Sequence, residues 1–265
     1  GHVDQALQGS LSVVAGMRGL AGDGDKAGLR AQVRDLLIST LRGTDDVRRL
    51  FIVDDGAFHS VAFQPNQEHA VLAYAGSDHR VYVYELDADV GKSLPACSPR
   101  AVATAVAFDA TGRSLVAGCD DGTISFWSSM DWTRLGSGNL QVFDRRVKVW
   151  TIAASPSGRV LAVGGTDNRV MLVPLGPDGA PSHEPPHPAG GDAPRGHVWS
   201  LAFSPSGDAL LVGDGVGSVL QCEVRAAGSV TCGRSAEYPG GAGGSGQDRA
   251  SADAIRAFSF APDGL

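Results

Sequence analysis

The sequence predicts a mainly β fold of about four similar antiparallel sheets, with one leading and one trailing strand, preceded by an α-helical hairpin. Three observations lead to this prediction. A pattern of apolar runs and turns returns several times along the chain, residues inside the runs alternate between two faces, and residues 1–43 instead follow a helical period.

The repeated pattern is clearest in residues 196–224. Its order of apolar run, tight turn, second apolar run, polar turn and third alternating run returns three times upstream and begins once more downstream. Short strands joined by tight turns, repeated about every 40 to 50 residues, are typical of a β-propeller in which each copy forms one blade. The second residues of the marking turns are Pro65, Ala110, Pro156, Pro205 and Pro262.

Alternation within the runs supports the strand prediction. Val81 and Val83 fall on one face of a pleated strand, whereas Tyr82 and Tyr84 fall on the other. The second run of each copy is nearly all apolar, which predicts a strand covered on both faces. We therefore expect these second strands to be the inner, most buried strands of their blades. They are residues 70–74, 114–117, 160–163 and 209–212.

The copies divide the chain into a helical segment and an incomplete propeller. Residues 1–43 are expected to end an upstream helical region, and residues 44–265 to form the propeller. Residues 49–53 form a leading strand, and only the first strand of a fifth copy is present, so we expect a fragment with exposed strand edges. The predicted blades are about 58–98, 101–144, 146–194 and 196–235, with another beginning at 253–265.

The helical prediction rests on two groups of apolar residues separated by the Gly/Asp-rich turn 22–25. We expect two antiparallel amphipathic helices, because apolar faces of this size must be covered. The apolar positions are Val3, Leu7, Leu11, Val14 and Met17, then Leu29, Val33, Leu36, Leu37 and Leu41.

The order x-h-x-F-S-P-x-G, apolar run and G-x-x-D-x-x-h-x-h-W resembles the WD-repeat β-propeller family over roughly the last four-fifths of the chain. Gly196 and His197 match the Gly-His pair of that family, and Trp127 matches its Trp. The other copies hold Tyr84, Val173 and Cys222 at the Trp position, and the following Asp is replaced in every copy. We therefore expect packing, rather than the hydrogen-bonded side chains of a regular blade, to hold these blades together.

A helical hairpin placed directly before such repeats resembles the junction in bacterial STAND-type regulators, which are signal-transducing NTPases. The resemblance implies that the repeats are the C-terminal part of a larger regulator, in which they sense a signal or hold the NTPase inactive. The NTPase itself is not expected in this chain, because no G-x-x-x-x-G-K-[ST] loop occurs.

Charge and hydropathy narrow the classes of partner. The net charge of −7 argues against a general nucleic-acid binder and against adhesion to anionic membranes. No run of about twenty apolar residues occurs, so we expect no transmembrane helix. We expect a cytoplasmic protein.

The four cysteines give one candidate pair. Cys97 and Cys119 have no metal-like spacing to each other or to a histidine. Cys222 and Cys232 flank the turn 225–228, which predicts that they are cross-strand neighbours, close enough for a disulfide. We expect reduced thiols instead, because nothing in the sequence indicates an oxidising compartment.

Two insertions interrupt the repeats. Residues 176–195 contain six prolines and predict a mobile surface loop. His183, Glu184 and His187 lie there, but the intervening prolines supply no further ligands, so we expect no metal site. Residues 233–253 are glycine-rich and predict a flexible linker. We expect no cofactor.

Catalytic motifs are absent: neither G-x-S-x-G nor H-E-x-x-H occurs. Asp54, Asp55 and the aspartates of later copies sit in predicted turns, where a carboxylate usually bonds the local backbone. Trp127, Trp150 and Trp199 fall in strands and are assigned to the core. Trp132 lies in a connecting segment, where an exposed Trp would be an interface anchor.

We therefore predict a non-catalytic interaction or sensor scaffold, not an enzyme, whose loops bind a protein partner or another domain of the same polypeptide. The alternative is a hydrolase-like propeller enzyme or a small-ligand sensor with its site in the central channel. The strands expected to be innermost argue against an enzyme, because an active site in the channel needs polar side chains there. Only His69 and Arg159, at the starts of these strands, are polar. The candidate contact residues on the rim are Asp78, His79, Asp120, Asp121, Trp132, Asp167 and Asn168.

Overall fold

The computed structural model describes residues 58–65, 70–225, 228–237, 254–258 and 260. The chain divides into two compact units, Gly1–Asp55 and Gly56–Leu265, and the described residues all belong to the second. The predicted hairpin 1–43 and the leading strand 49–53 lie outside the described residues. Within the described residues the regular secondary structure is entirely β.

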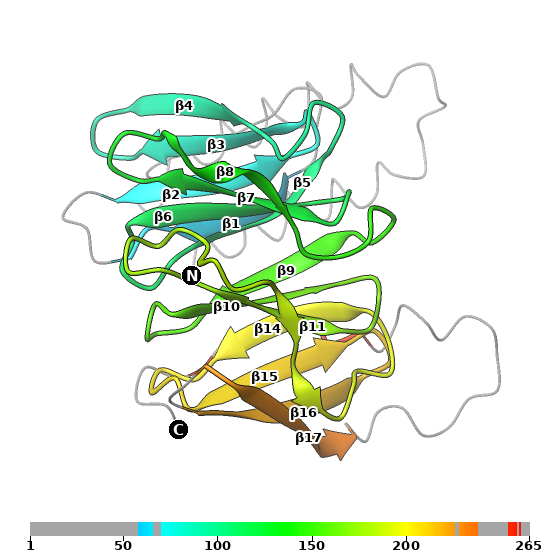
Figure 1. The fold of residues 1–265 in the computed structure, drawn as a ribbon. Helices are drawn as coiled ribbons and strands as arrows, with labels where there is room; N and C mark the ends of the chain where they lie inside the picture. The colour runs from blue at the N-terminus through cyan, green and yellow to red at the C-terminus, as the bar shows by residue number, and fades with distance from the viewer. Residues whose placement is uncertain (1–57, 66–69, 226–227, 238–253, 259, 261–265) are drawn as a thin grey trace, which may run out of the picture. The chain divides into compact units, whose positions relative to one another are not determined.

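Four sheets follow one another in chain order (Figure 1). The first two are antiparallel meanders, in which every strand pairs with the next one along the chain. The strands of the first sheet are β1 (Phe58–Phe63), β2 (Val71–Gly76), β3 (Arg80–Glu85) and β4 (Val90–Pro95). Those of the second are β5 (Ala103–Phe108), β6 (Ser114–Cys119), β7 (Thr123–Ser128) and β8 (Arg134–Gln141).

The third and fourth sheets keep the same order, with short additions at their outer edges. In the fourth sheet, the two-residue strand β13 lies parallel to β17 outside the meander. The strands of the third sheet are β9 (Val149–Ala154), β10 (Val160–Gly165), β11 (Val170–Pro174) and β12 (His187–Pro188). Those of the fourth are β13 (Gly190–Gly191), β14 (Val198–Phe203), β15 (Ala209–Asp214), β16 (Ser218–Val224) and β17 (Val230–Glu237).

The proline-rich insertion 176–195 does not form a loop alone. It supplies β12 to the third sheet and β13 to the fourth, and Leu175 and Pro181 form a bridge near its start. The prolines were expected to exclude helix and central-strand structure, and that expectation is compatible with the two short strands. Pro is tolerated at a sheet edge, where its missing N–H is not needed, so the expectation of a loop alone was too broad. Both short strands lie at such edges.

The first strand of each sheet is the innermost one. β1 contacts β5, β5 contacts β9, and β9 contacts β14. The prediction that the second strands are the most buried is confirmed for β6 and β10, all of whose residues are buried. The prediction that they are innermost is wrong. A strand in the middle of a sheet is covered by both neighbouring sheets, so high burial does not mark the inner edge.

Each of three sheets contacts the part of the chain that follows it through a glycine in its second strand and a β-branched residue. This residue begins the first strand of the next sheet in two cases, and is Ile255 of the segment 254–258 in the third. A Cβ atom on the glycine would lie between 2.3 and 2.6 Å from a methyl group of its partner, closer than carbon atoms pack. The absence of a side chain is therefore what lets the sheets approach. The pairs are Gly118–Val149, Gly164–Val198 and Gly213–Ile255.

The first junction uses a different pair at the equivalent positions. The register of β1 and β2 places Ala75 where the other sheets have the glycine, and the register of β5 and β6 places Ala103 where the next sheets have valine. Both alanines are fully buried in the same apolar cluster. Ala75 adds a methyl group where the other sheets have glycine, and Ala103 is smaller than the valine at the facing position. The two changes offset each other, as close packing requires.

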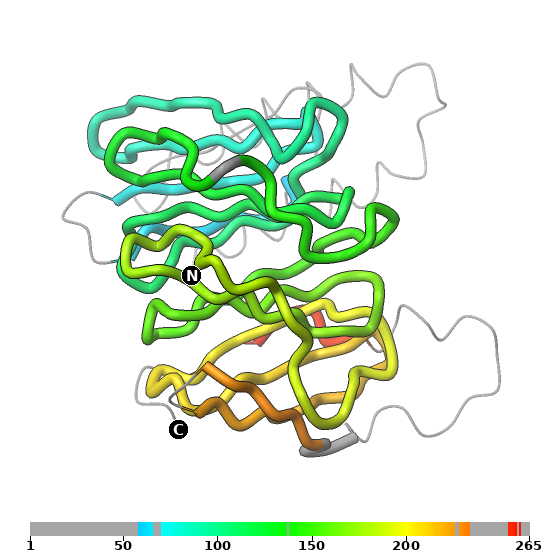
Figure 2. The backbone as a smooth tube through the Cα atoms, viewed as in Figure 1, coloured from blue at the N-terminus to red at the C-terminus, as the bar shows by residue number. Residues whose placement is uncertain are grey.

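Hydroxyl groups of the first strands add polar links between sheets. Ser60 accepts a hydrogen bond from Val106 N–H at 3.1 Å, and Thr104 donates to the carbonyl of Val149. Ser200 donates to the carbonyl of Ile255 at 2.8 Å. Figure 2 shows the segment 254–258 (red) beside the last sheet.

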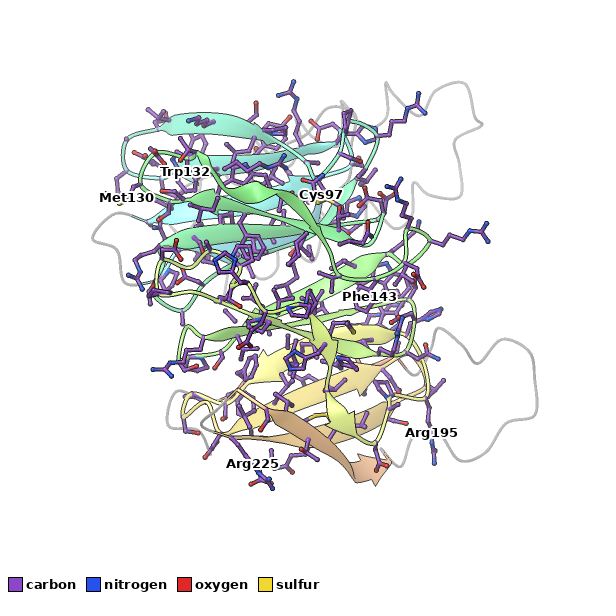
Figure 3. The ribbon with its side chains drawn as sticks, in the orientation of Figure 1. Cys97, Met130, Trp132, Phe143, Arg195 and Arg225 are labelled. Carbon is purple, nitrogen blue, oxygen red and sulfur yellow. A yellow bond between two sulfur atoms is a disulfide. The ribbon has the colours of Figure 1, made fainter. Side chains whose placement is uncertain are left out.

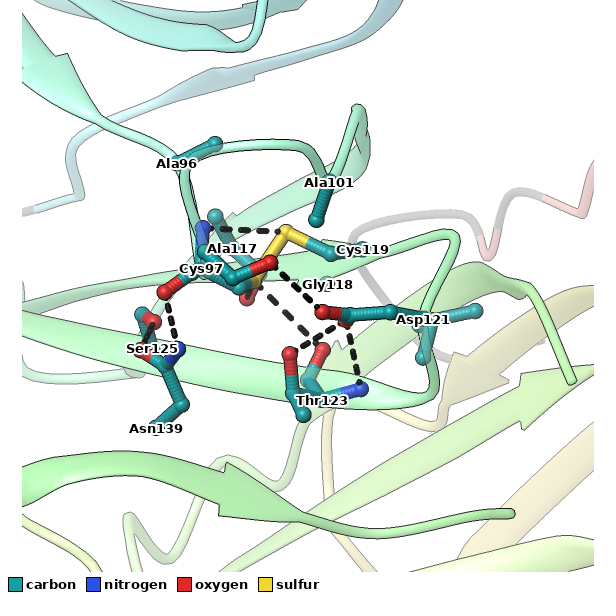
Figure 4. Close-up of a disulfide and its surroundings, with 12 residues drawn as sticks. Ala96, Cys97, Ala101, Ala117, Gly118, Cys119, Asp121, Thr123, Ser125 and Asn139 are labelled. Atoms are coloured by element: carbon teal, nitrogen blue, oxygen red, sulfur yellow. Dashed lines mark hydrogen bonds between the residues drawn. A yellow bond between two sulfur atoms is a disulfide. The ribbon is translucent and has the colours of Figure 1, made fainter. Parts of the chain in front are cut away.

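All four cysteines form disulfides, Cys97–Cys119 (Figure 4) and Cys222–Cys232. The predicted cross-strand placement of Cys222 and Cys232 is confirmed by the register of β16 and β17. The expectation of reduced thiols at Cys222 and Cys232 is wrong, and the bond between Cys97 and Cys119 was not predicted. The sequence could not indicate the first pair, because Cys97 lies in the connection between two sheets and reaches Cys119 only through sheet packing.

The glycine interlock can be tested with a double-mutant cycle. Gly164→Ala should lower the free energy of unfolding by about 1–3 kcal/mol, because the new methyl group overlaps Val198. Val198→Ala alone should cost ~2 kcal/mol for the cavity it leaves. The double variant should recover about 1 kcal/mol relative to the sum, as the Ala75–Ala103 junction suggests.

Urea unfolding followed by circular dichroism measures all three variants. Gly233→Ala is the matched control, because a Cβ there has no atom within 4 Å. It should be neutral or stabilising by about 0.4–1 kcal/mol, since it reduces only the freedom of the unfolded chain. Additive effects of the two junction substitutions would contradict the interlock.

The disulfides predict that the unfolded, unreduced protein has no thiol that reacts with iodoacetamide. Peptide mapping by mass spectrometry should recover the two linked pairs. Replacing Cys222 and Cys232 together by alanine should lower the free energy of unfolding by about 2–4 kcal/mol, because the unfolded chain regains freedom. Free thiols in the purified chain, or scrambled pairs, would contradict the assignment.

Candidate functional site

The turns between the second and third strands lie at one end of the sheets, which we call the β2–β3 rim. The outer strands also end there, so the connections between successive sheets cross the same rim. We define the rim by these turns and connections. The turns are residues 77–79, 120–122, 166–169 and 215–217, and the connections are residues 96–102, 142–148 and 192–197.

Six of the seven predicted contact residues lie on this rim, in equivalent turns of three sheets. They are Asp78, His79, Asp120, Asp121, Asp167 and Asn168. Trp132 lies in the turn between β7 and β8, at the opposite end of the sheets. Figure 3 shows it beside Met130, on the far side from Phe143 and Arg195. The structure therefore brings six of the residues to one rim and places the seventh elsewhere.

The first turn uses both of its predicted residues within the fold. The hydroxyl of Tyr82 donates to the carboxylate of Asp78, and the ring Nδ1 of His79 lies 3.2 Å from the carbonyl oxygen of Ala101. The Asp78 carboxylate stabilises the neutral phenol, which raises the pKa of Tyr82 to about 12. His79 has a positive φ of 66°, which the tight turn requires.

Asp120 and Asp121 brace the second turn, and Figure 4 shows Asp121 beside Thr123. Asp120 accepts a hydrogen bond from Val102 N–H at 2.8 Å, which ties the turn to the connection entering the same sheet. Asp121 accepts from the Thr123 hydroxyl at 2.5 Å and from the Ser98 hydroxyl at 2.9 Å. Both aspartates have the structural role that we expected, because each accepts hydrogen bonds from nearby backbone or side-chain groups.

The third turn carries an ion pair and a contact to the next sheet. Arg169 Nε donates to Asp167 at 2.6 Å, so the charges of these two side chains offset each other. Asn168 has a φ of 59°, and its Oδ1 lies 3.2 Å from Nδ1 of His197 in the following connection. Asn168 thus links the third sheet to the fourth.

Side chains hold the rim connections in place at successive sheets. Thr166 Oγ1 accepts from Lys148 N–H at 3.0 Å, in the manner of Asp120 and Val102. Asp214 accepts from Arg195 N–H at 3.0 Å and also from Val216 and Ser218 N–H. Asp214 is fully buried, and these donors compensate its desolvation. The rim is therefore a set of braced loops.

Two tryptophans assigned to the core from the sequence instead form a half-exposed cluster on this rim. Trp150 and Trp199 stack with ring centroids 3.9 Å apart. His197 meets Trp150 edge-on at 5.4 Å, and the guanidinium of Arg256 lies 4.8 Å from the centroid of Trp199. We call these four residues the tryptophan cluster. The prediction is confirmed only for Trp127, which is buried.

The cluster arises from an irregularity of the first strands. The pairing of β9 with β10, and of β14 with β15, shifts by one residue near its start, and Trp150 and Trp199 occupy the extra position. Such a bulge re-aims a side chain out of the regular alternation. The sequence prediction placed both tryptophans in regular strands, and so in the core. The alternation of side chains along a strand gives no sign of the bulge.

Trp132 is half-buried rather than exposed. It packs against the apolar cluster of the first two sheets and has a positive φ of 60° in its turn. The adjacent Met130 is the exposed residue, at 91% of its full surface.

The described residues hold one cluster of potential metal ligands. The group there with metal-ligand separations is Cys97, Cys119 and Asp121, but the two sulfurs are bonded to each other and are not free to bind a cation. His69 lies outside the described residues, and Arg159 is exposed in the turn before β10 at the opposite rim. The hydroxyls of the innermost strands serve the links between sheets. Within the described residues no helix has the length and apolar character needed to cross a bilayer.

The chain matches the sequence profile described as WD domain, G-beta repeat, at residues 92–128, 139–173 and 193–218. The chain contains three WD40 repeats. Each of the first two repeats starts in the outer strand of one sheet and runs through the first three strands of the next. The WD40 unit of sequence is therefore offset by one strand from the sheet, so the chain itself connects neighbouring sheets.

No curated protein matches the sequence. Among solved structures, a chain from the crystal structure of a mitotic checkpoint complex is similar, with a TM-score of 0.49 and 16% sequence identity. The match covers 67% of this chain and 56% of that chain.

The bond between Tyr82 and Asp78 predicts an alkaline transition. The phenol should ionise near pH 12 in the folded protein instead of near its ordinary pKa of 10. Because the folded state holds the proton more tightly, this stabilisation is complete below pH 10 and is lost as the pH rises from 10 to 12. Asp78→Ala should lower the pKa of Tyr82, as followed by phenolate absorbance at 295 nm.

Tyr82→Phe is the control for that titration, because it removes the signal of this residue alone. An unchanged absorbance titration in Asp78→Ala would contradict the hydrogen bond between Tyr82 and Asp78. The Asp78 carboxylate would then be available for contacts outside the chain.

Proposed function

We propose that the chain is a non-catalytic scaffold that binds a protein partner through the β2–β3 rim. WD40 repeats generally mediate protein–protein interaction, and their domains are typically non-catalytic. The observation that carries the choice of rim is the tryptophan cluster. Half-exposed stacked tryptophans at the end of braced loops have the composition and rigidity of an interface anchor.

The predicted rim residues contribute to this proposal mainly as supports. Each of the six is engaged in a hydrogen bond or ion pair that fixes its turn, as described above. Fixed turns lose little freedom on binding, which favours affinity. Their remaining donor and acceptor capacity is available to a partner, so we keep Asp78, His79, Asp120, Asp121, Asp167 and Asn168 as secondary contact residues.

The wider setting is also a proposal. A larger bacterial signalling regulator, in which the partner is another protein or another domain of the same polypeptide, is supported by the helical periodicity that directly precedes the repeats. The disulfides bear on the compartment, because buried disulfides are rare in a reducing cytosol. A cytoplasmic regulator would hold these cysteines reduced.

The proposal predicts that photo-crosslinks to a partner form on one rim. Benzoylphenylalanine placed at Val216, which is exposed on the β2–β3 rim, should crosslink a protein when the intact gene product is expressed in its native cell. The same group at Met130 on the opposite rim, which is even more exposed than Val216, should yield little product. The measurement is gel mobility followed by mass spectrometry of the linked peptides. Crosslinks confined to Met130 would refute the choice of rim.

A further inference from the structure

A basic turn lies directly beside the tryptophan cluster. Residues 144–148 read Asp-Arg-Arg-Val-Lys, so three cations stand against one carboxylate in a chain whose net charge is −7. Arg145, Arg146 and Lys148 are exposed. Within the described residues none of these three side chains forms an ion pair.

The basic turn is fixed at both ends. At its start, Val142 and Phe143 N–H donate to the carbonyl of Gly122 at 3.0 and 3.1 Å. Gly122 has a φ of 77°, and a Cβ there would lie 2.6 Å from the carbonyl oxygen of Asp144. At its end, Lys148 N–H donates to the Thr166 hydroxyl at 3.0 Å, and Thr166 N–H donates to the carbonyl of Lys148 at 3.1 Å. Arg145, Arg146 and Lys148 thus lie on a fixed segment between the second and third rim turns.

The basic turn leads directly into the tryptophan cluster along the chain, because Lys148 precedes Trp150 by only two residues. The row of equivalent positions along the first strands is Thr104, Trp150, Trp199 and Arg256. Trp199 is covered by Trp150 on one side and by Arg256. Thr104 is short, and its hydroxyl is bonded to the carbonyl of Val149, so Trp150 keeps a partly exposed ring beside the basic turn.

We propose that this surface binds an acidic peptide segment of a protein partner, with carboxylates at the basic turn and an aromatic or large apolar side chain against Trp150. This inference rests on the proposed function and names the chemistry of its partner. Carboxylates match exposed arginines in charge and geometry, and stacked aromatic rings favour a further ring or apolar chain.

The charge distribution favours a short acidic peptide over a nucleic acid. Asp167 is paired with Arg169, and the basic turn is a local exception on an acidic chain. The neighbouring rim connections each hold one further exposed arginine, Arg100 and Arg195. A short acidic segment can lie on the three clustered cations alone, whereas a long polyanion would extend over other parts of a chain whose net charge is −7 and be repelled. The same repulsion disfavours acidic segments elsewhere on the chain and so adds specificity.

The test selects phage-displayed random peptides on the full 265-residue chain. Selected sequences should be enriched in Asp and Glu next to Phe, Tyr, Trp or Leu. The best synthetic peptide should bind about tenfold or more weakly to Arg145→Glu/Arg146→Glu, and its affinity should fall as salt is raised. Fluorescence anisotropy measures both.

Arg159→Glu is the matched control, because Arg159 is also an exposed arginine but lies on the opposite rim. It should leave the affinity within about twofold, as expected for a distant surface charge. Trp150→Phe should weaken binding less than the charge reversal, and Trp150→Ala more than Trp150→Phe. Unchanged thermal unfolding of each variant shows that lost binding is not lost folding.

Selection of basic or uncharged peptides would overturn the inference, as would equal binding to Arg145→Glu/Arg146→Glu and the wild type. Competition by oligodeoxythymidylate that exceeds competition by the peptide would instead identify a nucleic-acid surface, and would also overturn it. Failure of the proposed function is separate: crosslinks at Met130 and not at Val216 would show that partners use the opposite rim, whatever peptides bind here.

Discussion

Contact between a bare glycine backbone and a β-branched side chain of the segment that follows the sheet is the constraint on which the arrangement of the sheets depends. It recurs at Gly118–Val149, Gly164–Val198 and Gly213–Ile255. The close approach brings the first strands near enough for Thr104 and Ser200 to reach the following strand. It also sets the rim turns of successive sheets side by side, so the proposed binding surface is a consequence of how the sheets pack.

The parts of the fold that depend on local sequence could be predicted, and the parts that depend on packing between sheets could not. Alternation and turn residues indicated the strands and placed Cys222 opposite Cys232, because both signals act within one hairpin. The Cys97–Cys119 bond joins a connection to the end of β6, and no local pattern encodes that proximity. The inner position of the first strands likewise appears only when whole sheets are placed together.

The candidate site divides in the same way. Polar turn residues such as Asp120 and Asn168 could be found from the sequence, because turns require them, and the structure shows how they hold the turns. Trp150 and Trp199 were missed because a one-residue shift in strand pairing turns them from the core to the rim. The sequence did contain one signal: Trp occupies the same position in two successive copies, six residues before the marking proline.

Rigid support and uneven charge together explain how a small surface on this chain can be selective. Hydrogen bonds from Asp120, Thr166 and Asp214 fix the connections before any partner arrives, so binding need not order them. The basic turn then supplies attraction at one place on an otherwise acidic chain, and repulsion elsewhere rejects acidic segments that lack the matching apolar residue. In the proposed mode of binding, a partner is chosen by requiring both acidic charge and an apolar anchor.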